Sequence, residues 1–180
     1  FVRGDAATYR FEHRFDGLLS RFGTTFFADP AAALRHLAGA VRSGGRILFL
    51  AWQAPERNPW VGVPGRALRG IAPVPGPAPK HAPGPFAFAD PEHVVALLRT
   101  GGWSDAEARP VAMPMALGRD LAEALRFTTE LGPLSRALAE LDPGARGAAL
   151  AALATALEPH LGVGGVVLEG RCWLFRAHRP

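Results

Sequence analysis

Six histidines and one cysteine are the residues of this sequence best suited to metal binding or to acid and base chemistry. The histidines are spread along the chain, at His13, His36, His81, His93, His160 and His178. No histidine pairs with another, or with Cys172, at the spacing typical of metal ligands. The sequence therefore predicts no metal centre.

His81 is the best candidate for a general base, because it lies in a Pro- and Gly-rich segment of the kind that often closes over a site. The alternative is a solvated loop histidine. Cys172 stands in an apolar stretch and is predicted to be a small core residue rather than a nucleophile. The glycines from Gly162 to Gly165 precede an expected strand instead of linking a strand to a helix, which predicts a turn and no phosphate-binding loop.

Two tryptophans form the other candidate site. Trp52 ends an apolar run, and Trp60 follows closely in the segment Asn58-Pro59-Trp60. Two indole rings near the mouth of a pocket could pack against a planar or isoprenoid substrate. The alternative is that both tryptophans anchor a loop.

Composition places these residues in one ordinary domain. The chain has 180 residues, of which 48% are hydrophobic, and its 20 Lys+Arg exceed its 16 Asp+Glu by four charges. Only Lys80 is a lysine, and the arginines are spread along the chain; the nearest approach to a basic patch is Arg171, Arg176, His178 and Arg179. A nucleic-acid-binding protein would gather its positive charge on one face, so we expect no nucleic-acid partner.

One cysteine permits no disulfide within the chain, which fits a cytoplasmic location. The longest small and apolar stretch, residues 148–157, falls far short of the roughly 20 residues that a membrane span needs. We therefore expect no membrane partner. The chain begins at Phe1 without a signal segment, and the sequence is interpreted as the later part of something longer.

The elements before residue 60 are predicted to be a strand, a helix and a second strand. The apolar runs 15–20 and 46–52 suit strands that are buried on both faces, as in a parallel sheet under helices. Between them Asp29 can cap a helix that begins at Pro30 and stops at Ser43-Gly44-Gly45. Two parallel strands joined by one helix are predicted to form a right-handed crossover. The expected core face of this helix is Leu34, Leu37, Ala38 and Val41.

The same signals for the start and the end of a helix, Asp-Pro and Gly-Gly, occur again later in the sequence. Asp90-Pro91 and Gly101-Gly102 bracket a second helix, with Val94, Leu97 and Leu98 on its core face. Before it, residues 54–89 are interpreted as a long ordered loop or lid, whose centre at 72–85 can hold neither a long helix nor an interior strand.

A strand is predicted at 106–115 and a last strand at 166–177. A helical insertion on the substrate side, residues 119–161, is expected between them. Its three helical segments are 120–131, 134–141 and 145–157.

This order resembles the middle of a class I S-adenosylmethionine-dependent methyltransferase, of the small-molecule group related to ubiquinone and menaquinone biosynthesis enzymes. The resemblance rests on the Gly4-Asp5-Ala6 turn, the strand that ends in Ser20-Arg21-Phe22, the capped helix, and the R-I-L-F-L-A-W strand with its Asn-Pro-Trp segment. It implies an α/β, Rossmann-like sheet of strand order 3-2-1-4-5-7-6. This chain would hold strands 4, 5, 6 and 7 and the end of strand 3.

The resemblance also implies roles for single residues, with S-adenosylmethionine as the cofactor. The carboxylate of Asp5 would accept a hydrogen bond from the adenine amino group, and the backbone of Ala6 would meet a ring nitrogen. Ser20, Arg21 and Phe22 would line the methionine end of the cofactor. The alternatives are an ordinary turn for Asp5, and for Phe22 a place in the core with Phe26 and Phe27.

Substrate contacts would come from Trp52, Asn58 and Trp60. No general base is implied, and His81 is a candidate only by its position in the lid.

The family's most diagnostic parts are absent from this sequence. No Gly-x-Gly-x-Gly loop follows a first strand, and no acidic residue ends a second strand to bind the ribose hydroxyls. Both would lie upstream of Phe1, in two βα units of about 30 residues or more each. Without them, the strand at 15–20 is expected to be an exposed apolar edge.

Two functions are therefore compared. The first is transfer of a methyl group from S-adenosylmethionine to a small, hydrophobic or aromatic molecule. The second is a non-catalytic, methyltransferase-like remnant that pairs with a protein partner across the exposed edge. The alternative to such a partner is a homo-oligomer.

Overall fold

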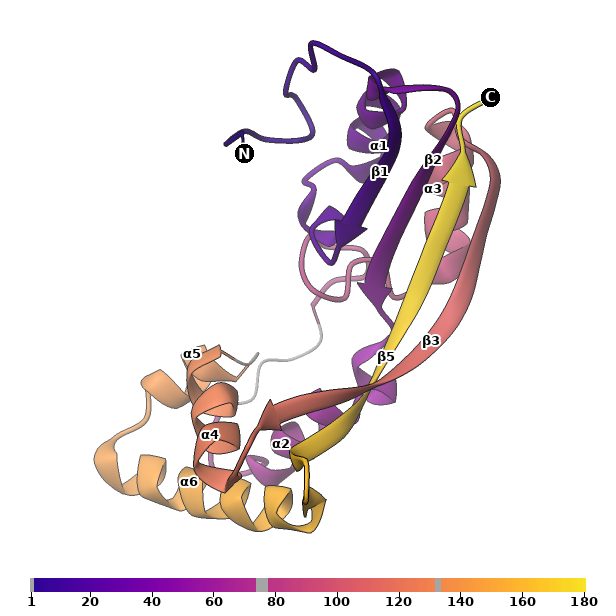
Figure 1. The fold of residues 1–180 in the computed structure, drawn as a ribbon. Coiled ribbons are helices and arrows are strands. Elements are labelled where there is room, and N and C mark those ends of the chain that lie inside the picture. Colours follow the sequence, from indigo (N-terminus) through magenta and orange to yellow (C-terminus); the bar gives the residue numbers. More distant parts are fainter. Residues whose placement is uncertain (1, 74–77, 132–133) are drawn as a thin grey trace. The chain divides into compact units, whose positions relative to one another are not determined.

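Residues 2–73, 78–131 and 134–180 are described by the computed structural model (Figure 1). Their contacts divide the chain into two units, and both β3 and β5 contribute residues to each of them. The first unit comprises Phe1–Ala54, Pro79–Val111 and Cys172–Pro180, and the second comprises Pro55–Ala78 and Ala112–Arg171.

A mixed β-sheet is built around one parallel pair of strands. β1 (Phe15–Arg21) runs parallel to β2 (Val41–Trp52), and α1 (Pro30–Ala40) connects them. β5 (Gly165–His178) pairs antiparallel with β2. β3 (Ser104–Gly118) is the next strand, so the order is β1-β2-β5-β3. The short β4 (Leu161–Gly162) pairs with the start of β5.

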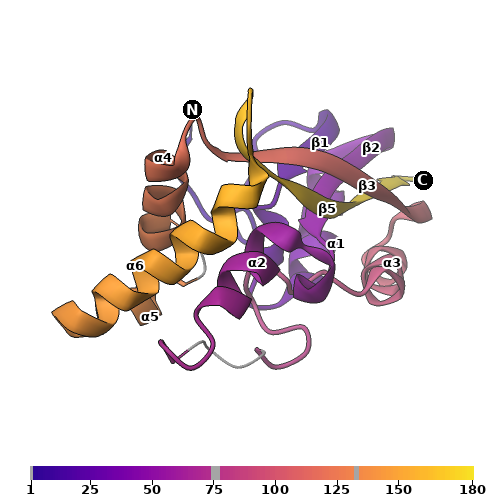
Figure 2. The ribbon, with the colours of Figure 1, turned by 90° about the horizontal axis from the view of Figure 1, so that it is seen from below.

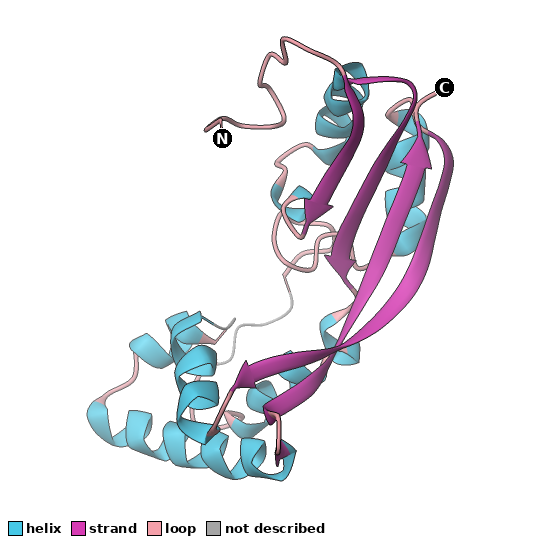
Figure 3. Ribbon diagram, in the orientation of Figure 1, coloured by secondary structure: helices cyan, strands magenta, loops and turns pink. Residues whose placement is uncertain are grey.

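Helices and helical turns make up the remaining regular structure (Figure 3). α3 (Pro91–Thr100) belongs to the first unit, whereas α2 and α4 to α6 belong to the second. The second-unit elements are the 3-10 turn Pro55–Arg57, α2 (Pro59–Ala67), α4 (Leu121–Arg126), the π-turn Phe127–Leu131, α5 (Ser135–Ala139), α6 (Pro143–Leu157) and the 3-10 turn Glu158–His160. This mixed α/β architecture confirms the predicted fold class.

The predicted Asp-Pro caps are confirmed. The Asp29 carboxylate accepts a hydrogen bond from Ala32 N at 2.9 Å, and Asp90 accepts from Glu92 N and His93 N at 3.2 and 3.3 Å. Asp142 caps α6 in the same way, by accepting from Gly144 N and Ala145 N. In each case Pro occupies the first helical position, where its missing N–H costs nothing.

The end of α1 differs from the prediction. The helix ends at Ala40, and Ser43-Gly44-Gly45 lies within β2. The guanidinium of Arg179 explains the earlier end, because it donates to the carbonyls of Ala38 and Val41 and so replaces the next turn of the helix.

The core of the first unit lies on one face of the sheet. Buried side chains of α1 and α3, which contact each other, pack there on Ile47, Phe49 and Phe175. The buried members of this cluster are Leu34, Leu37, Ala38, Val41, Ile47, Phe49, Ala51, Ala87, Phe88, Val94, Leu98, Trp103, Ala106, Phe175 and Ala177. The predicted core positions Leu34, Leu37, Ala38, Val94 and Leu98 are thus confirmed on the two helices, with Leu97 partly buried at the edge of the cluster. Val41 is also buried in the core, but as the first residue of β2 and not as part of the helix.

The prediction that β1 and β2 are buried on both faces is wrong. Leu19 in β1 is 78% exposed and its neighbour Leu48 in β2 is 37% exposed, whereas Ile47 and Phe49 are fully buried. The reason is that α1 and α3 both cover the same face, and in the part of the first unit that the structure describes no helix covers the other. β1 is also the edge of the sheet, as expected.

Two further expectations need correction. Residues 2–14 form turns and contain no strand, so the expected end of a strand 3 is not found there. Among the described residues β1 pairs with β2 alone, and no other described strand lies beside β1 for the N-terminal segment to join. The region 54–89 is also not one long loop, because α2 lies within it. Its centre has neither a long helix nor a strand among residues 72–73 and 78–85, and 74–77 lie outside the described residues.

The second unit is mainly helical. α6 packs along α2 and α4 (Figure 2). Its core cluster contains Leu68, Leu134, Leu138, Ala149 and Leu153. The three predicted helical segments are present, and the hairpin between β4 and β5 turns at Val163-Gly164, as predicted.

Candidate functional site

The carboxyl ends of β1 and β2 lie next to each other (Figure 1). The strands are paired in register as far as Arg21 and Leu50, and Phe22 N continues the ladder by donating to Leu50 O at 3.1 Å. In sheets with parallel strands, ligands bind in the crevice outside the carboxyl ends. The residues that follow β1 and β2 are therefore the first candidates for a site.

Phe22 and Trp52 form a stacked aromatic pair at this end of the sheet. Their ring centroids are 4.4 Å apart and their planes differ by 7°. Phe22 has a φ of +64°, in the left-handed region that residues with a β-carbon seldom adopt. Such backbone strain persists only where the surroundings enforce it, and it gathers at functional sites.

Short-range hydrogen bonds hold Phe22 in place. The hydroxyl of Thr25 donates to Phe22 O at 2.9 Å, from the 3-10 turn Thr24–Phe26 that follows β1. Thr24 is also buried, and its Oγ1 has no hydrogen-bond partner among the described residues.

The other two residues expected at the methionine end of the cofactor are at the same strand end. Ser20 is half-buried and the side chain of Arg21 is exposed. The alternative, a place in the core for Phe22, Phe26 and Phe27, holds for Phe27, which packs against the core cluster. It does not hold for Phe26, which is 59% exposed, and Phe22 stacks on Trp52.

Gln53 lies at the same strand end and was not singled out by the sequence. It directly follows β2, is 3% exposed, and its Nε2 donates to Cys172 O at 2.8 Å, linking β2 to β5. The signal was a polar residue at the end of an apolar strand. Cys172 is fully buried, and burial raises the pKa of its thiol to about 11, as suits the predicted core residue.

Asp5 and Ala6 lie in an exposed turn before β1. Asp5 Oδ1 accepts a hydrogen bond from Ala7 N at 2.9 Å, and Asp5 O accepts from Thr8 N and Tyr9 N. The turn is tied to α1, because His36 Nε2 is 2.8 Å from Tyr9 O.

Asn58 and Trp60 belong to the second unit and bind each other. Trp60 Nε1 donates to Asn58 Oδ1 at 3.1 Å, and Arg171 N donates to the same oxygen at 2.8 Å. Asn58 is 0% exposed and Trp60 is 8% exposed. Both side chains therefore help to hold the second unit together.

His81 stacks on His93 at the beginning of α3. The ring centroids are 3.7 Å apart, and the neighbouring Lys80 Nζ lies 3.1 Å from Asp90 Oδ2. Burial lowers the pKa of His93, and the nearby His81 lowers it further. The segment is also fixed at Gly84, whose N–H donates to Thr25 O at 3.0 Å.

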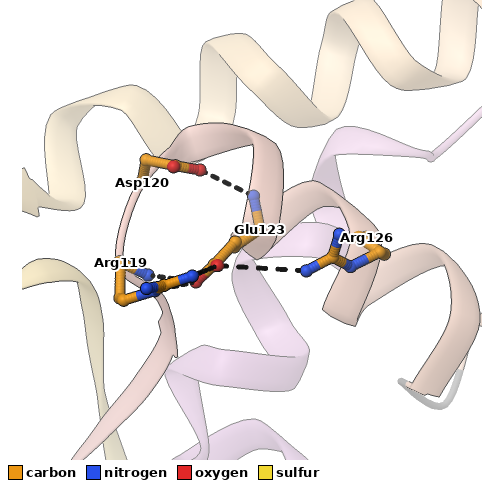
Figure 4. A network of polar contacts seen from close by, with 4 residues as sticks. All are labelled: Arg119, Asp120, Glu123 and Arg126. Carbon is orange, nitrogen blue, oxygen red and sulfur yellow. Dashed lines mark hydrogen bonds and ion pairs between the residues drawn. The ribbon is translucent and has the colours of Figure 1, made fainter.

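A polar network in the second unit caps α4 (Figure 4). Asp120 accepts from Glu123 N at 2.8 Å, while the Glu123 carboxylate binds the backbone N–H and the guanidinium of Arg119. Arg126 approaches the same carboxylate at 4.0 Å. Arg119 lowers the pKa of Glu123 to about 2, mainly through their hydrogen bond. This is reciprocal capping of a helix N-terminus.

Metal-binding clusters and membrane-spanning helices are absent from the described residues. Among them, no group of three or more His, Cys, Asp or Glu side chains is arranged to hold a metal ion. None of the helices in the described ranges is long and apolar enough to cross a membrane.

Comparison with solved structures shows which fold this arrangement belongs to. A presumed methyltransferase from Bacillus halodurans matches 100% of this chain with a TM-score of 0.54 and 14% identity, over 77% of its own length. The YcgJ protein of Bacillus subtilis matches 98% of this chain with a TM-score of 0.52 and 15% identity, over 69% of its length.

A third match is a structure concerned with conversion of a disulfide bond into a thioacetal group during echinomycin biosynthesis, with a TM-score of 0.51 and 18% identity. It is matched by 98% of this chain, over 54% of its own length.

The chain therefore has a methyltransferase-like α/β fold, as the sequence resemblance implied. Sequence comparison adds nothing to this: no protein-family model matches the chain, and no curated protein matches it.

Proposed function

We propose that this chain is part of an S-adenosylmethionine-dependent methyltransferase that acts on a small hydrophobic or aromatic molecule. The observation that carries the proposal is the aromatic pair Phe22–Trp52 at the carboxyl ends of two parallel strands, in a fold similar to that of a presumed methyltransferase. The strand order β1-β2-β5-β3, with β5 antiparallel to β2, is also the order that strands 4, 5, 7 and 6 would have in the family's sheet.

The residues at this strand end suit the chemistry of the cofactor. The exposed guanidinium of Arg21 can bind a carboxylate in two places at once, as the methionine end of the cofactor requires. Ser20 offers a hydroxyl beside it. The flat faces of Phe22 and Trp52 favour a cationic sulfonium and an aromatic substrate, because the ring faces are electron-rich.

The turn at Asp5 suits the adenine end. One oxygen of the Asp5 carboxylate is used by Ala7 N, and among the described residues the turn's hydrogen bonds do not include the N–H of Ala6. A carboxylate acceptor beside a backbone donor matches the amino group and ring nitrogen of adenine. We therefore propose Asp5 and Ala6 as the adenine contacts.

The bound cofactor would supply an electrophilic methyl group, which an oxygen, nitrogen or carbon atom of the substrate would attack in line with the carbon–sulfur bond. The work of the protein is then to hold the acceptor atom in line and to keep water away. Trp52 is proposed to orient the substrate. Asn58 and Trp60 are proposed to support the substrate region, and His81 remains a candidate base for substrates that must lose a proton.

Calorimetric titration with S-adenosylhomocysteine tests this proposal. It is made into this chain and into a form extended upstream by about one hundred residues, the length that two βα units and their connections would need. We expect binding by the extended form, and loss of that binding on Asp5→Ala. Glu12→Ala, an exposed acid in the same segment, is the matched control and should bind normally. No binding by either form would contradict the proposal.

A further inference from the structure

Residues 79–85, called the docked segment below, are attached to the first unit at both ends. At one end Lys80 pairs with Asp90, and the ring of His81 lies on that of His93 with a 27° angle between the planes. At the other end the N–H of Gly84 donates to Thr25 O. The segment thus links the first turn of α3 to the 3-10 turn that follows β1.

The backbone of the docked segment is held in an unfavourable conformation. His81 has a φ of +64°, and Gly84 has a φ of +157°. A left-handed histidine is strained by its β-carbon, so the contacts of its side chain must compensate for the strain. Its stack on His93 is the contact that the structure provides.

We propose that the His81–His93 stack makes the docked segment sensitive to pH, so that it is held when the His93 ring is neutral and released when that ring takes up a proton. A neutral His93 ring stacks favourably on His81, with centroids 3.7 Å apart, whereas a proton on His93 places a partly buried positive charge against the docked segment and its Lys80. This conformational device goes beyond the proposed methyl transfer and does not depend on it.

The charges around the stack favour release. His93 is faced by His81 and Lys80 from the docked segment and by Asp90 at the start of its own helix. Protonation of His93 would therefore place a second positive charge, beside that of Lys80, near one carboxylate. That carboxylate is already engaged, because Asp90 accepts from two backbone N–H groups and pairs with Lys80.

The direction in which pH changes the docking follows from the lowered pKa of His93. Burial and the positive neighbours lower the pKa of His93 from its ordinary value of 6.5, against the opposing effect of Asp90. The docked form thus binds a proton less tightly than the free segment does. Docking is fully stabilised above pH 6.5 and weakens as the pH falls through the lowered pKa.

Release of the docked segment would affect the candidate site through Thr25. Thr25 accepts the Gly84 hydrogen bond with its carbonyl, and with its hydroxyl it donates to Phe22 O. Undocking therefore removes one of the constraints on the turn that holds Phe22 in its strained conformation.

The single lysine of the chain gives a direct test. A protease that cuts only after lysine can cleave one bond, Lys80–His81, and only when the docked segment is released. The cleavage rate is measured between pH 8 and pH 5.5 and divided, at each pH, by the rate on an unstructured peptide with the sequence around Lys80. We expect this ratio to rise severalfold on acidification, because the docked form binds a proton at His93 less tightly than the released form does.

Variants distinguish the stack from other sources of pH dependence. The double variant His81→Phe/His93→Phe keeps two flat rings without a titrating group, and its ratio should not change with pH. His13→Gln, an exposed histidine in the same unit, should keep the full rise. A flat ratio in the unmodified protein, or an unchanged rise in the double variant, would overturn the proposal.

Nuclear magnetic resonance of the imidazole protons guards against a variant that fails to fold. In the unmodified protein the His93 resonance should titrate with a midpoint below 6.5, and the cleavage ratio should rise with the same midpoint. A rise in the cleavage ratio that does not follow the titration of the His93 resonance would assign the effect to another group and overturn the proposal.

Discussion

Phe22 and Trp52 lie face to face at the ends of neighbouring parallel strands, with ring centroids 4.4 Å apart. Thirty positions of sequence separate them, and the pairing of β1 with β2 brings them together. The left-handed φ of Phe22 turns the chain immediately after β1, and the stack on Trp52 fixes the ring. The strained residue and its partner thus form one rigid aromatic surface.

Trp52→Leu tests whether this surface contributes to binding. The substitution keeps an apolar side chain but removes the stack, which is worth about 1 kcal/mol in typical aromatic pairs. We expect the extended form to bind S-adenosylhomocysteine about fivefold more weakly by calorimetry, because the ring of Phe22 is then no longer fixed. Phe26→Leu is the matched control, since Phe26 is 59% exposed and should leave affinity unchanged. Equal affinities for both variants would exclude a role for the stack.

Asn58 is expected to matter for stability. Its Oδ1 accepts hydrogen bonds from Trp60 Nε1 and from the backbone N–H of Arg171. Asn58→Ala leaves two donors without this acceptor in a buried environment, which should lower the free energy of unfolding by about 3 kcal/mol. Urea denaturation followed by tryptophan fluorescence measures the loss.

Two other substitutions make the Asn58 result interpretable. Trp60→Phe removes the donor Nε1 itself, so it should lower the free energy of unfolding by only about 1 kcal/mol. Glu56→Ala alters an exposed neighbour and should cost almost nothing. If Asn58→Ala were as stable as Glu56→Ala, the shared acceptor would not be a structural link.

Gly165 and Gly164 provide a matched pair of glycines. Gly165 has a φ of +91°, and a β-carbon there would collide with Gly118 O and lie 2.9 Å from the Cα of Arg119. At Gly164 nothing lies within 4 Å of a β-carbon. We expect Gly165→Ala to lower the free energy of unfolding by about 3 kcal/mol, since it combines backbone strain with overpacking. A loss as small as that of Gly164→Ala, in parallel urea titrations, would contradict this.

Local signals predicted the elements of this fold well. The Asp-Pro pairs at 29–30 and 90–91 start helices because both the cap and the fixed φ of proline act within one turn. The buried positions Leu34 and Val94 were also predicted, because they follow from helical spacing alone.

Local sequence signals could not predict contacts between distant segments. Gln53 binds Cys172 across 119 positions, and Asn58 binds Arg171 across 113. Nothing in the neighbourhood of either residue in the sequence indicates its partner. The apolar run of β2 likewise shows that its residues prefer burial, but it cannot show that both helices cover one face and leave Leu48 exposed.

Glu123 should make α4 sensitive to acid. Its pKa is lowered from 4.5 to about 2, first by the hydrogen bond from the Arg119 side chain and then by that from the Arg119 backbone. A carboxylate with a lowered pKa stabilises the folded state above pH 4.5, and this contribution is lost as the pH falls toward 2. The unmodified protein should therefore lose more stability between pH 6 and pH 2.5 than Glu123→Gln does, as measured by the urea midpoint.

Salt separates the two parts of this effect. The Arg119 side chain is 89% exposed, so added salt should screen its attraction to Glu123 and reduce the difference between the two proteins. The backbone hydrogen bond from Arg119 N to Glu123 Oε2, at 3.0 Å, is much less affected by salt and should preserve part of it. Glu130→Gln, an exposed glutamate that follows α4, is the matched control and should behave like the unmodified protein. If Glu123→Gln lost as much stability in acid as Glu130→Gln, the capping network would have no role in the acid response.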